Sequence, residues 1–204
     1  MKLVAVSQRV VLEPNYNEMR DALDQKICLF LIEAGYLPLP VPNIMTKKNN
    51  QRQSNKIFLE KWLLSTKPDA IVLSGGNDLG EYFKRDLTEK YLLEYAKKKN
   101  LSLLGICRGM QMMTVWLGGT LQKVNNHVAK NHKIIGSINR TVNSYHNYSI
   151  LECPSELIVL ARSLDNNIEA IKHFSMPWEG WMWHPERNKK FNDFDLKRIR
   201  NLFG

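Results

Sequence analysis

The sequence predicts an α/β fold, and two apolar segments with the helical pattern that follows them carry this prediction. Residues 70–73 and 101–104 are short and rich in apolar side chains, which is typical of strands buried on both faces of a sheet. A stretch without proline follows the second segment, with apolar residues at helical spacing. These residues are Met110, Met113 and Leu117.

The N-terminal elements are expected to be a strand, a helix and an edge strand. Lys2–Ser7 is the predicted first strand, and residues 36–42, where proline alternates with other residues, are typical of an extended edge segment. Between them we predict a helix that ends at Gly35, since glycine favours the left-handed conformation of helix ends. The apolar positions of this helix are Met19, Leu23, Ile27, Phe30, Leu31 and Ala34.

The polar segment 43–56 is predicted to be a surface loop. Its interpretation stays open between a solvated connection and a lid that supplies cations to a substrate. A short helix is expected over 57–64. The next helix is expected over 86–99, because Asp86 and Glu89 have the spacing of a capping box and lysines gather at its end.

Strand patterns dominate the second half of the chain. Strands are predicted at 133–138, 157–162 and 168–173, and the last two are expected to pair through a turn at 165–167. Residues 180–186 are predicted to be a strand that runs into a turn. A C-terminal helix is expected from the apolar stripe of Leu196, Ile199 and Phe203.

Length and composition fit one globular domain over residues 1–204. Hydrophobic residues make up 44% of the chain and charged residues 24%, and neither a signal peptide nor a membrane-length apolar segment is predicted. The three cysteines form no CxxC pair, which fits a reducing compartment and argues against a disulfide framework or a zinc site. We therefore expect a cytoplasmic protein with no membrane partner.

The formal net charge of +9 has three explanations, namely nucleic acid, an anionic small substrate, or a basic proteome. The lysines are scattered along the chain, and no recognition helix or RNA-binding aromatic motif occurs in the sequence. Nucleic acid is therefore not an expected partner.

A cysteine between two glycines is the first chemical feature. Cys107 lies in the pattern G-x-C-x-G between an expected strand and an expected helix, as the serine does in a G-x-S-x-G turn. Glycines relieve the crowding of such a turn, and a thiol at a helix N-terminus meets N–H groups that favour negative charge. The Arg108 N–H would then be free to face an oxyanion. The alternative is a buried structural cysteine.

The segment His184-Pro185-Glu186 is the second chemical feature. We expect both titratable side chains on one side of an extended segment. A carboxylate can fix the tautomer of an imidazole, and a cysteine with a pKa of about 8.5 needs a basic partner at neutral pH. A surface turn is the alternative. No carboxylate in comparable register accompanies the remaining histidines, which are His127, His132, His146 and His173.

Several motifs together resemble the class I glutamine amidotransferase family over nearly the whole chain. They are G-I-C-R-G-M-Q at 105–111, S-G-G at 74–76 and W-H-P-E at 183–186. The stand-alone γ-glutamyl hydrolase branch, peptidase family C26, is similar at V-N-S-Y-H-N (142–147), E-A-I (169–171) and A-G-Y-L-P (34–38). The resemblance implies a three-layer α/β/α, flavodoxin-like domain with a mainly parallel central sheet and a site at the carboxyl ends of its strands.

The resemblance also implies roles for individual residues. Cys107 matches the nucleophile, His184 the general base and acid, and Glu186 the residue that orients the histidine. Gly76 and Arg108 match the backbone donors of the oxyanion hole. The implied contacts to the γ-glutamyl group are Gln111, Ser144, Tyr145 and His146.

These roles imply cysteine-dependent hydrolysis of a γ-glutamyl amide through a γ-glutamyl thioester, a reaction that is expected to need no metal and no organic cofactor. We favour a free-standing hydrolase over a glutaminase subunit that passes ammonia to a separate synthetase, and over a catalytically silent binding protein. A homodimer is left open.

The leaving group is expected to be anionic, because several cations could surround the same edge of the sheet. Arg9 follows the first strand and should lie beside Gly76 and Cys107. Among the substrates of the family that the sequence resembles, general likeness favours γ-glutamyl-CDP-amidate, which would give cytidine diphosphoramidate for capsule phosphoramidate synthesis. The alternative is a γ-glutamyl amine such as γ-glutamyl-γ-aminobutyrate. The further candidate cations, which could instead be ordinary surface charges, are Arg20, Lys47, Lys48, Arg52, Lys84 and Arg85.

Overall fold

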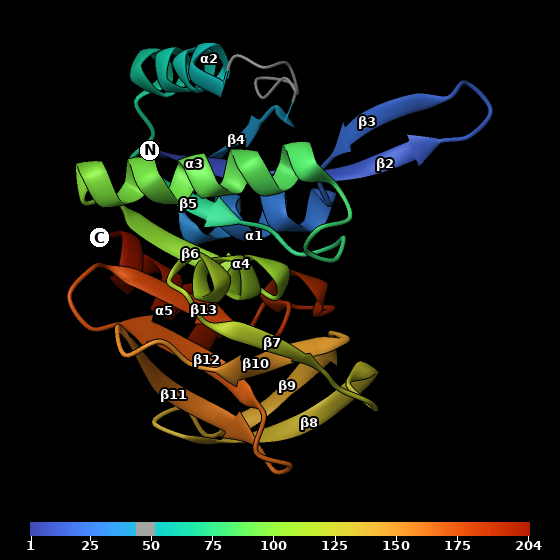
Figure 1. Ribbon diagram of the computed structural model, residues 1–204. Coiled ribbons are helices and arrows are strands. Elements are labelled where there is room, and N and C mark those ends of the chain that lie inside the picture. Colours follow the sequence, from blue (N-terminus) through green and yellow to red (C-terminus); the bar gives the residue numbers. More distant parts are fainter. Residues whose placement is uncertain (44–51) are drawn as a thin grey trace.

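A central sheet organises the computed structural model, which describes residues 1–43 and 52–204 (Figure 1). Within those residues the sheet has nine strands in the order β4-β1-β5-β6-β13-β12-β11-β8-β9. The parallel strands are β4 (Tyr36–Val41), β1 (Lys2–Ser7), β5 (Ala70–Leu73), β6 (Ser102–Ile106) and β13 (Trp178–Trp181). The strands that join antiparallel are β12 (Ile168–His173), β11 (Leu157–Ser163), β8 (Val128–Gly136) and β9 (Arg140–Tyr145).

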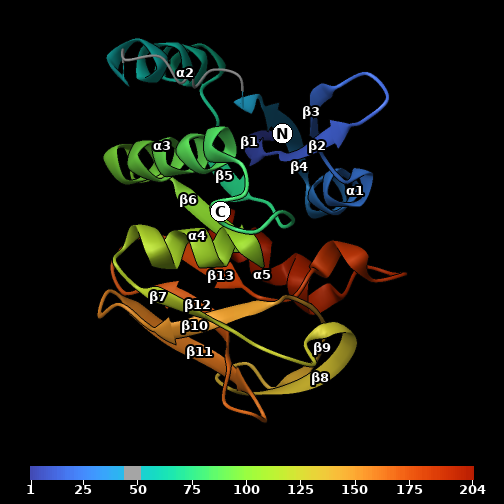
Figure 2. The same ribbon diagram turned by 45° about the vertical axis from the view of Figure 1, so that its right-hand side comes forward.

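Helices cover both faces of the parallel half, so the architecture has three layers (Figures 1 and 2). On one face lie α3 (Phe83–Lys99) and α4 (Arg108–Trp116), with α2 (Arg52–Thr66) packed against α3. On the other face lie α1 (Gln25–Ala34) and α5 (Asp193–Phe203). The central parallel strands β5 and β6 are buried on both sides, which explains their short apolar runs, whereas β4 is a partly exposed edge strand. The predicted α/β/α class with a mainly parallel sheet is confirmed.

The segment before α1 differs from its prediction. Residues 9–22 form a hairpin of β2 (Arg9–Glu13) and β3 (Glu18–Ala22), which projects from the sheet (Figure 1). Met19 therefore lies on a strand and is exposed rather than part of a helix. The helix begins only at Gln25, because the Asp24 carboxylate accepts the Lys26 N–H at 2.9 Å and caps it. Its end at Gly35, with φ of +99°, is as predicted.

Three further elements differ from their predictions. The helix predicted at 57–64 begins earlier, at Arg52, so the end of the predicted loop 43–56 is helical, while residues 44–51 lie outside the described part. The capping box at Asp86 and Glu89 is wrong, since α3 begins at Phe83 and both carboxylates bind arginines instead. The strand predicted at 133–138 is found as β8, which begins five residues earlier.

The remaining strands are short. A two-stranded sheet joins β7 (Thr120–Lys123) to β10 (Tyr148–Glu152) and covers α4 on the side away from α3 (Figure 2).

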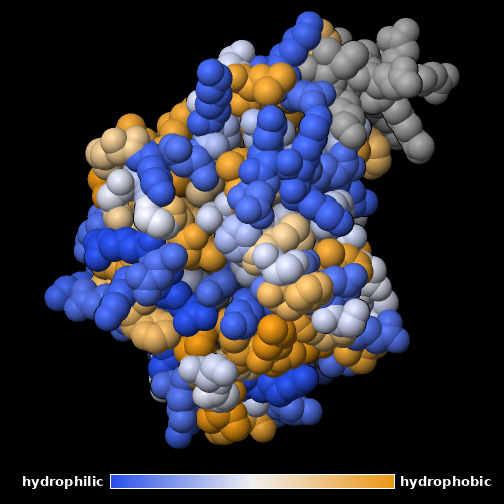
Figure 3. All heavy atoms as spheres, turned by 90° about the vertical axis from the view of Figure 1, so that its left-hand side faces the viewer, coloured by the Kyte–Doolittle hydropathy of each residue, from blue (hydrophilic) through white to orange (hydrophobic). Residues whose placement is uncertain are grey.

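None of the helices within residues 1–43 and 52–204 combines the length and the apolar character that a bilayer span needs. Hydrophilic and hydrophobic side chains are interspersed over the face drawn in Figure 3.

Candidate active site

Cys107 occupies the sharp turn between β6 and α4, where it is the N-cap residue of α4. Its φ of +50° and ψ of −104° are a strained combination for a residue with a side chain. A Cβ on Gly105 would lie 2.7 Å from the Gly109 carbonyl carbon, and a Cβ on Gly109 would lie 2.1 Å from the Leu73 carbonyl oxygen. Both glycines are therefore needed for β5, β6 and α4 to approach one another so closely.

His184 reaches Cys107 from the neighbouring strand. The Cys107 N–H donates to the Trp181 carbonyl at 2.7 Å, which fixes the ends of β6 and β13 side by side. The His184 ring, only 2% exposed, interacts with the Cys107 sulfur and places its Nδ1 2.6 Å from Glu186 Oε1. The backbone differs from the extended segment that the sequence predicts, because residues Pro185–Arg187 form a 3-10 turn, η2, that folds Glu186 back beside the imidazole.

The environment favours the charged form of His184. Burial opposes a charge on the ring, but the Glu186 carboxylate and the Cys107 sulfur outweigh burial and raise the pKa of His184 to about 9. Below that pH the imidazole is an imidazolium that faces a cysteine on one side and a carboxylate on the other. This arrangement suits a group that must deliver a proton.

This pKa predicts how stability depends on pH. Because the folded pKa of about 9 lies above the unfolded value near 6.5, the contribution of His184 is complete below pH 6.5 and is lost as the pH rises through 9. The loss should amount to about 3 kcal/mol of the free energy of unfolding. Urea unfolding of wild type and His184→Gln at several pH values tests this, and profiles that run parallel from pH 6 to 9 would contradict it.

Two residues that the sequence did not single out position His184. Asn143, on β9, donates from its Nδ2 to the His184 carbonyl at 2.8 Å and accepts the His184 N–H with its Oδ1 at 2.8 Å. Gly75 leaves room for the ring, since a Cβ there would lie 2.4 Å from His184 Cε1. Asn143 belongs to the V-N-S-Y-H-N motif and Gly75 to the S-G-G motif. These motifs were the only signals in the sequence for the two residues.

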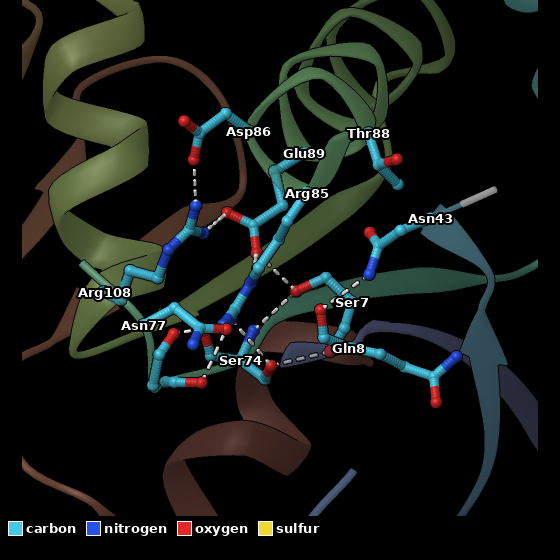
Figure 4. A network of polar contacts seen from close by, with 12 residues as sticks. Ser7, Gln8, Asn43, Ser74, Asn77, Arg85, Asp86, Thr88, Glu89 and Arg108 are labelled. Atoms are coloured by element: carbon cyan, nitrogen blue, oxygen red, sulfur yellow. Dashed lines mark hydrogen bonds and ion pairs between the residues drawn. The ribbon is translucent and has the colours of Figure 1, made fainter. Parts of the chain in front are cut away.

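A buried arginine holds the S-G-G loop, residues 74–76, from its interior side (Figure 4). The Arg85 guanidinium donates to the carbonyls of Ser74 at 2.8 Å and Gly75 at 3.0 Å, and also to that of Gly76. Gly76 itself has a φ of +83°, a conformation that favours glycine. Arg85 is fully buried, so its predicted place among the cations around the substrate is wrong.

Glu89 joins this clamp to the helix that carries Cys107 (Figure 4). One oxygen of Glu89 accepts from Arg85 Nε at 3.2 Å, and the other accepts from the side chain of Arg108, which also binds Asp86. Burial raises the pKa of Glu89, but the guanidinium groups of Arg108 and Arg85 outweigh burial and lower it, so the carboxylate stays charged. The network links the loop at Gly76 to the first residue of α4. Removing one partner of such a buried pair costs about 3–5 kcal/mol.

The predicted γ-glutamyl contacts have different surroundings. The ring of Tyr145 lies edge-on to that of His184, with 5.9 Å between centroids. Ser144 donates its hydroxyl to the His127 carbonyl at 2.6 Å, and Gln111 Nε2 donates to the Tyr148 carbonyl at 2.9 Å. Their roles in substrate binding stay predictions.

His146 faces the protein interior, in a group of three histidines around a carboxylate. His127, His132 and His146 each have a ring nitrogen within 3.7 Å of a Glu169 oxygen. As the sequence indicates, no carboxylate lies in comparable register beside these histidines; their partner comes from a distant strand, which local spacing could not reveal.

The candidate cations separate into distinct groups. Arg9 reaches the site, with its Nη1 3.5 Å from the position that a Cβ on Gly76 would take. Arg20 pairs instead with Glu13 and Glu18, and Lys84 lines a different hollow. A cation that the sequence did not single out is Arg187, whose guanidinium lies 4.4 Å from the centre of the Tyr145 ring. The candidates that fall outside the described residues are Lys47, Lys48 and the side chain of Arg52.

Comparisons with known proteins identify the family of the chain. The sequence matches the family Glutamine amidotransferase class-I over residues 41–199. It is 32% identical to the γ-glutamyl-CDP-amidate hydrolase of Campylobacter jejuni, with 95% of this chain and 94% of the relative covered. It is 26% identical to the γ-glutamyl-γ-aminobutyrate hydrolase of Escherichia coli O157:H7, with 87% and 82% covered.

A solved structure shares the fold. It is a Thermoplasma acidophilum protein provisionally described as part of a GMP synthase, and it superposes with a TM-score of 0.74 at 20% identity over 100% of this chain and 93% of that one. At this identity the likeness supports the fold alone. The family match over residues 41–199, together with the Campylobacter relative, shows that the chain belongs to the class I glutamine amidotransferase family.

Proposed function

We propose that this protein is a hydrolase that cleaves a γ-glutamyl amide to glutamate and a released amine or amidate. The observation that carries the proposal is the buried set of Cys107, His184 and Glu186 at a strained strand-to-helix turn. Support comes from the relatives named above, two of which are described as hydrolases of γ-glutamyl compounds. No role for Cys28 or Cys153 is needed.

Each residue has one chemical task in the proposed reaction. The Cys107 sulfur attacks the γ-carbonyl carbon as a thiolate, its proton being held by His184, and the backbone N–H groups of Gly76 and Arg108 stabilise the oxyanion. The C–N bond breaks as the His184 imidazolium delivers its proton to the leaving nitrogen. Water then attacks the thioester while His184 takes a proton from it, and the C–S bond breaks to release glutamate. Glu186 orients the imidazole and stabilises its charged form.

The proposed substrate is γ-glutamyl-CDP-amidate. The Campylobacter relative supports this choice because it is similar over nearly the full length of both chains. Arg9 supports it independently, because an arginine beside the S-G-G loop offers a forked donor to a phosphate on the leaving group. The alternatives are γ-glutamyl-γ-aminobutyrate, named for a second relative, and glutamine, if a partner synthetase accepts the ammonia.

A substrate panel with two arginine variants tests the choice. We expect the highest kcat/KM for γ-glutamyl-CDP-amidate, and a loss of about tenfold for it in Arg9→Gln, since a charge-assisted hydrogen bond contributes about 1.5–3 kcal/mol. Glutamine, which has no phosphate, should lose less. The matched control is Arg20→Gln, because Arg20 is paired with carboxylates on the same hairpin.

Salt dependence gives a second readout of the same contact. Turnover of γ-glutamyl-CDP-amidate should become less efficient as salt rises, because salt screens a partly exposed arginine. A preference for either phosphate-free compound, or equal losses in Arg9→Gln and Arg20→Gln, would contradict the anionic leaving group. Stimulation of glutamine hydrolysis by a partner protein would instead favour the glutaminase role.

A further inference from the structure

Four side chains that the proposed reaction does not use meet inside the antiparallel half of the sheet. We call them the histidine cluster: His127, His132, His146 and Glu169. His127 precedes β8, His132 lies on it, His146 follows β9, and Glu169 lies on β12. Glu169 is completely buried, and His127 and His146 are 3% and 2% exposed. A charged carboxylate in such a place needs a compensating partner.

Ring nitrogens of the histidine cluster lie close to both oxygens of the Glu169 carboxylate. Glu169 Oε2 lies 3.3 Å from His132 Nε2, and Oε1 lies 3.3 Å from His146 Nε2 and 3.7 Å from His127 Nδ1. Nevertheless, neither oxygen of Glu169 has a partner with hydrogen-bond geometry among the described residues, and His132 Nε2 has none either. Buried polar atoms left in this way require an explanation.

In the rings of His127 and His146, the nitrogen that points away from Glu169, here called the outer nitrogen, has neighbours that show where the proton lies. His127 Nε2 is 2.8 Å from Asp165 Oδ2, with the Asn167 amide farther away at 3.4 Å, and His146 Nδ1 is 3.0 Å from the Tyr148 carbonyl oxygen. Because both near neighbours are acceptors, these outer nitrogens carry the protons of the neutral rings.

The inner nitrogens of the neutral rings must then present lone pairs. His127 Nδ1 and His146 Nε2 lie 3.2 Å apart, and both approach Glu169 Oε1. Three lone pairs that converge repel one another unless a positive charge lies between them.

The spacing of these atoms is that of ligands around an ion. Ligands at about 2.0–2.2 Å from a tetrahedral zinc lie about 3.3–3.6 Å from one another, and the contacts above span 3.2 to 3.7 Å. The donor atoms of His127, His132 and Glu169 all lie within 4.8 Å of one another. The contacts of His127 to Asp165 and of His146 to a carbonyl are the outer-shell contacts that metal-binding histidines make.

We propose that the histidine cluster binds one zinc-class divalent ion, with Glu169 as the central ligand and imidazole nitrogens of His127, His132 and His146 around it. Four protein donors, of which only His132 is partly exposed, with 19% of its side chain accessible, describe a structural site rather than a catalytic one. The ion would join the segments of β8, β9 and β12 and fix the turn after Tyr145, beside His184.

The experiment uses untagged Cys107→Ser protein stripped with a chelator, so that neither a tag nor the active-site thiol binds the metal. When Zn²⁺ is added back, we expect native mass spectrometry to show one Zn²⁺ per chain. The Tm should rise by about 5–10 °C when the free Zn²⁺ concentration is a hundred times the Kd. Co²⁺ should give the visible absorption of a tetrahedral site without sulfur-to-metal charge-transfer bands.

Variants separate the histidine cluster from other metal-binding groups. Glu169→Gln and His132→Asn should lose stoichiometric binding, whereas Asp165→Asn should weaken it by about 10–100-fold. The matched control is His173→Asn, since His173 lies on β12 outside the cluster. If the ligand variants do not fold, the titration of the stripped parent protein decides alone. Absence of stoichiometric binding there, or binding that survives both ligand variants, overturns the proposal, and a shared proton then holds the cluster.

Discussion

Replacing Cys107 with serine is expected to reduce turnover of every γ-glutamyl substrate by at least about 10⁴-fold while the fold is retained. The substitution exchanges one atom at the turn, so the strained backbone and its neighbours are preserved, but a hydroxyl in this place is a far weaker nucleophile than a thiolate. The measurements are kcat for the best substrate and mass spectrometry after rapid acid quench. The wild-type protein should carry a γ-glutamyl group on Cys107, and the variant should not.

The chain supplies matched controls for this experiment. Cys28 and Cys153 are free thiols whose pKa values are raised, mainly by burial, so both are poorly suited to attack. Cys28→Ser and Cys153→Ser should therefore retain activity and the thioester. Full activity in Cys107→Ser, or a thioester on another cysteine, would refute the assigned nucleophile.

Replacing His184 with alanine is expected to lower kcat by about 10³–10⁴-fold, and Glu186→Gln should lower it less, by about 10–100-fold. The imidazole transfers a proton in both halves of the proposed reaction, whereas the carboxylate only orients the ring and raises its pKa. The pH profile distinguishes the two roles. In Glu186→Gln the fall of kcat at high pH should begin at a lower pH, because the pKa of His184 is no longer raised by a carboxylate.

The order of the two effects is the critical result. A larger loss in Glu186→Gln than in His184→Ala would show that the carboxylate reacts directly. Unfolding curves for both variants, measured at pH 7, distinguish loss of chemistry from loss of structure.

Local patterns predicted the elements that local forces determine. The buried strands at Lys2–Ser7 and Ala70–Leu73 were predictable because burial on both faces requires an unbroken apolar run. The β2–β3 hairpin was not, since β3 is largely exposed and so lacks an alternation of buried and exposed side chains. The motifs around Cys107 and His184 located the candidate site because each motif lies within a few residues of the chain.

Contacts between residues far apart in the sequence explain the features that local patterns did not predict. The spacing of Asp86 and Glu89 suits a helix start, yet a fully buried arginine beside them and Arg108 on the next helix claim both carboxylates. The histidine cluster likewise has no recognisable spacing in the sequence. Its members come together because the fold brings Glu169 on β12, with β11 between them in the sheet, within reach of the histidines on and beside β8 and β9.

The placement of Glu89 has a consequence for how specificity can change. Its two oxygens bind Arg85, which holds the S-G-G loop, and the side chain of Arg108. The distance between the two proposed oxyanion donors, the N–H groups of Gly76 and Arg108, is therefore set by α3, although neither donor lies on that helix. Two arginines would meet a leaving group, namely Arg9 on the β2–β3 hairpin and Arg187 on η2. Both lie outside the network of Arg85, Glu89 and Arg108. If the proposed roles hold, a new leaving group calls for changes at Arg9 or Arg187, whereas Glu89→Gln is expected to slow the reaction of every substrate alike.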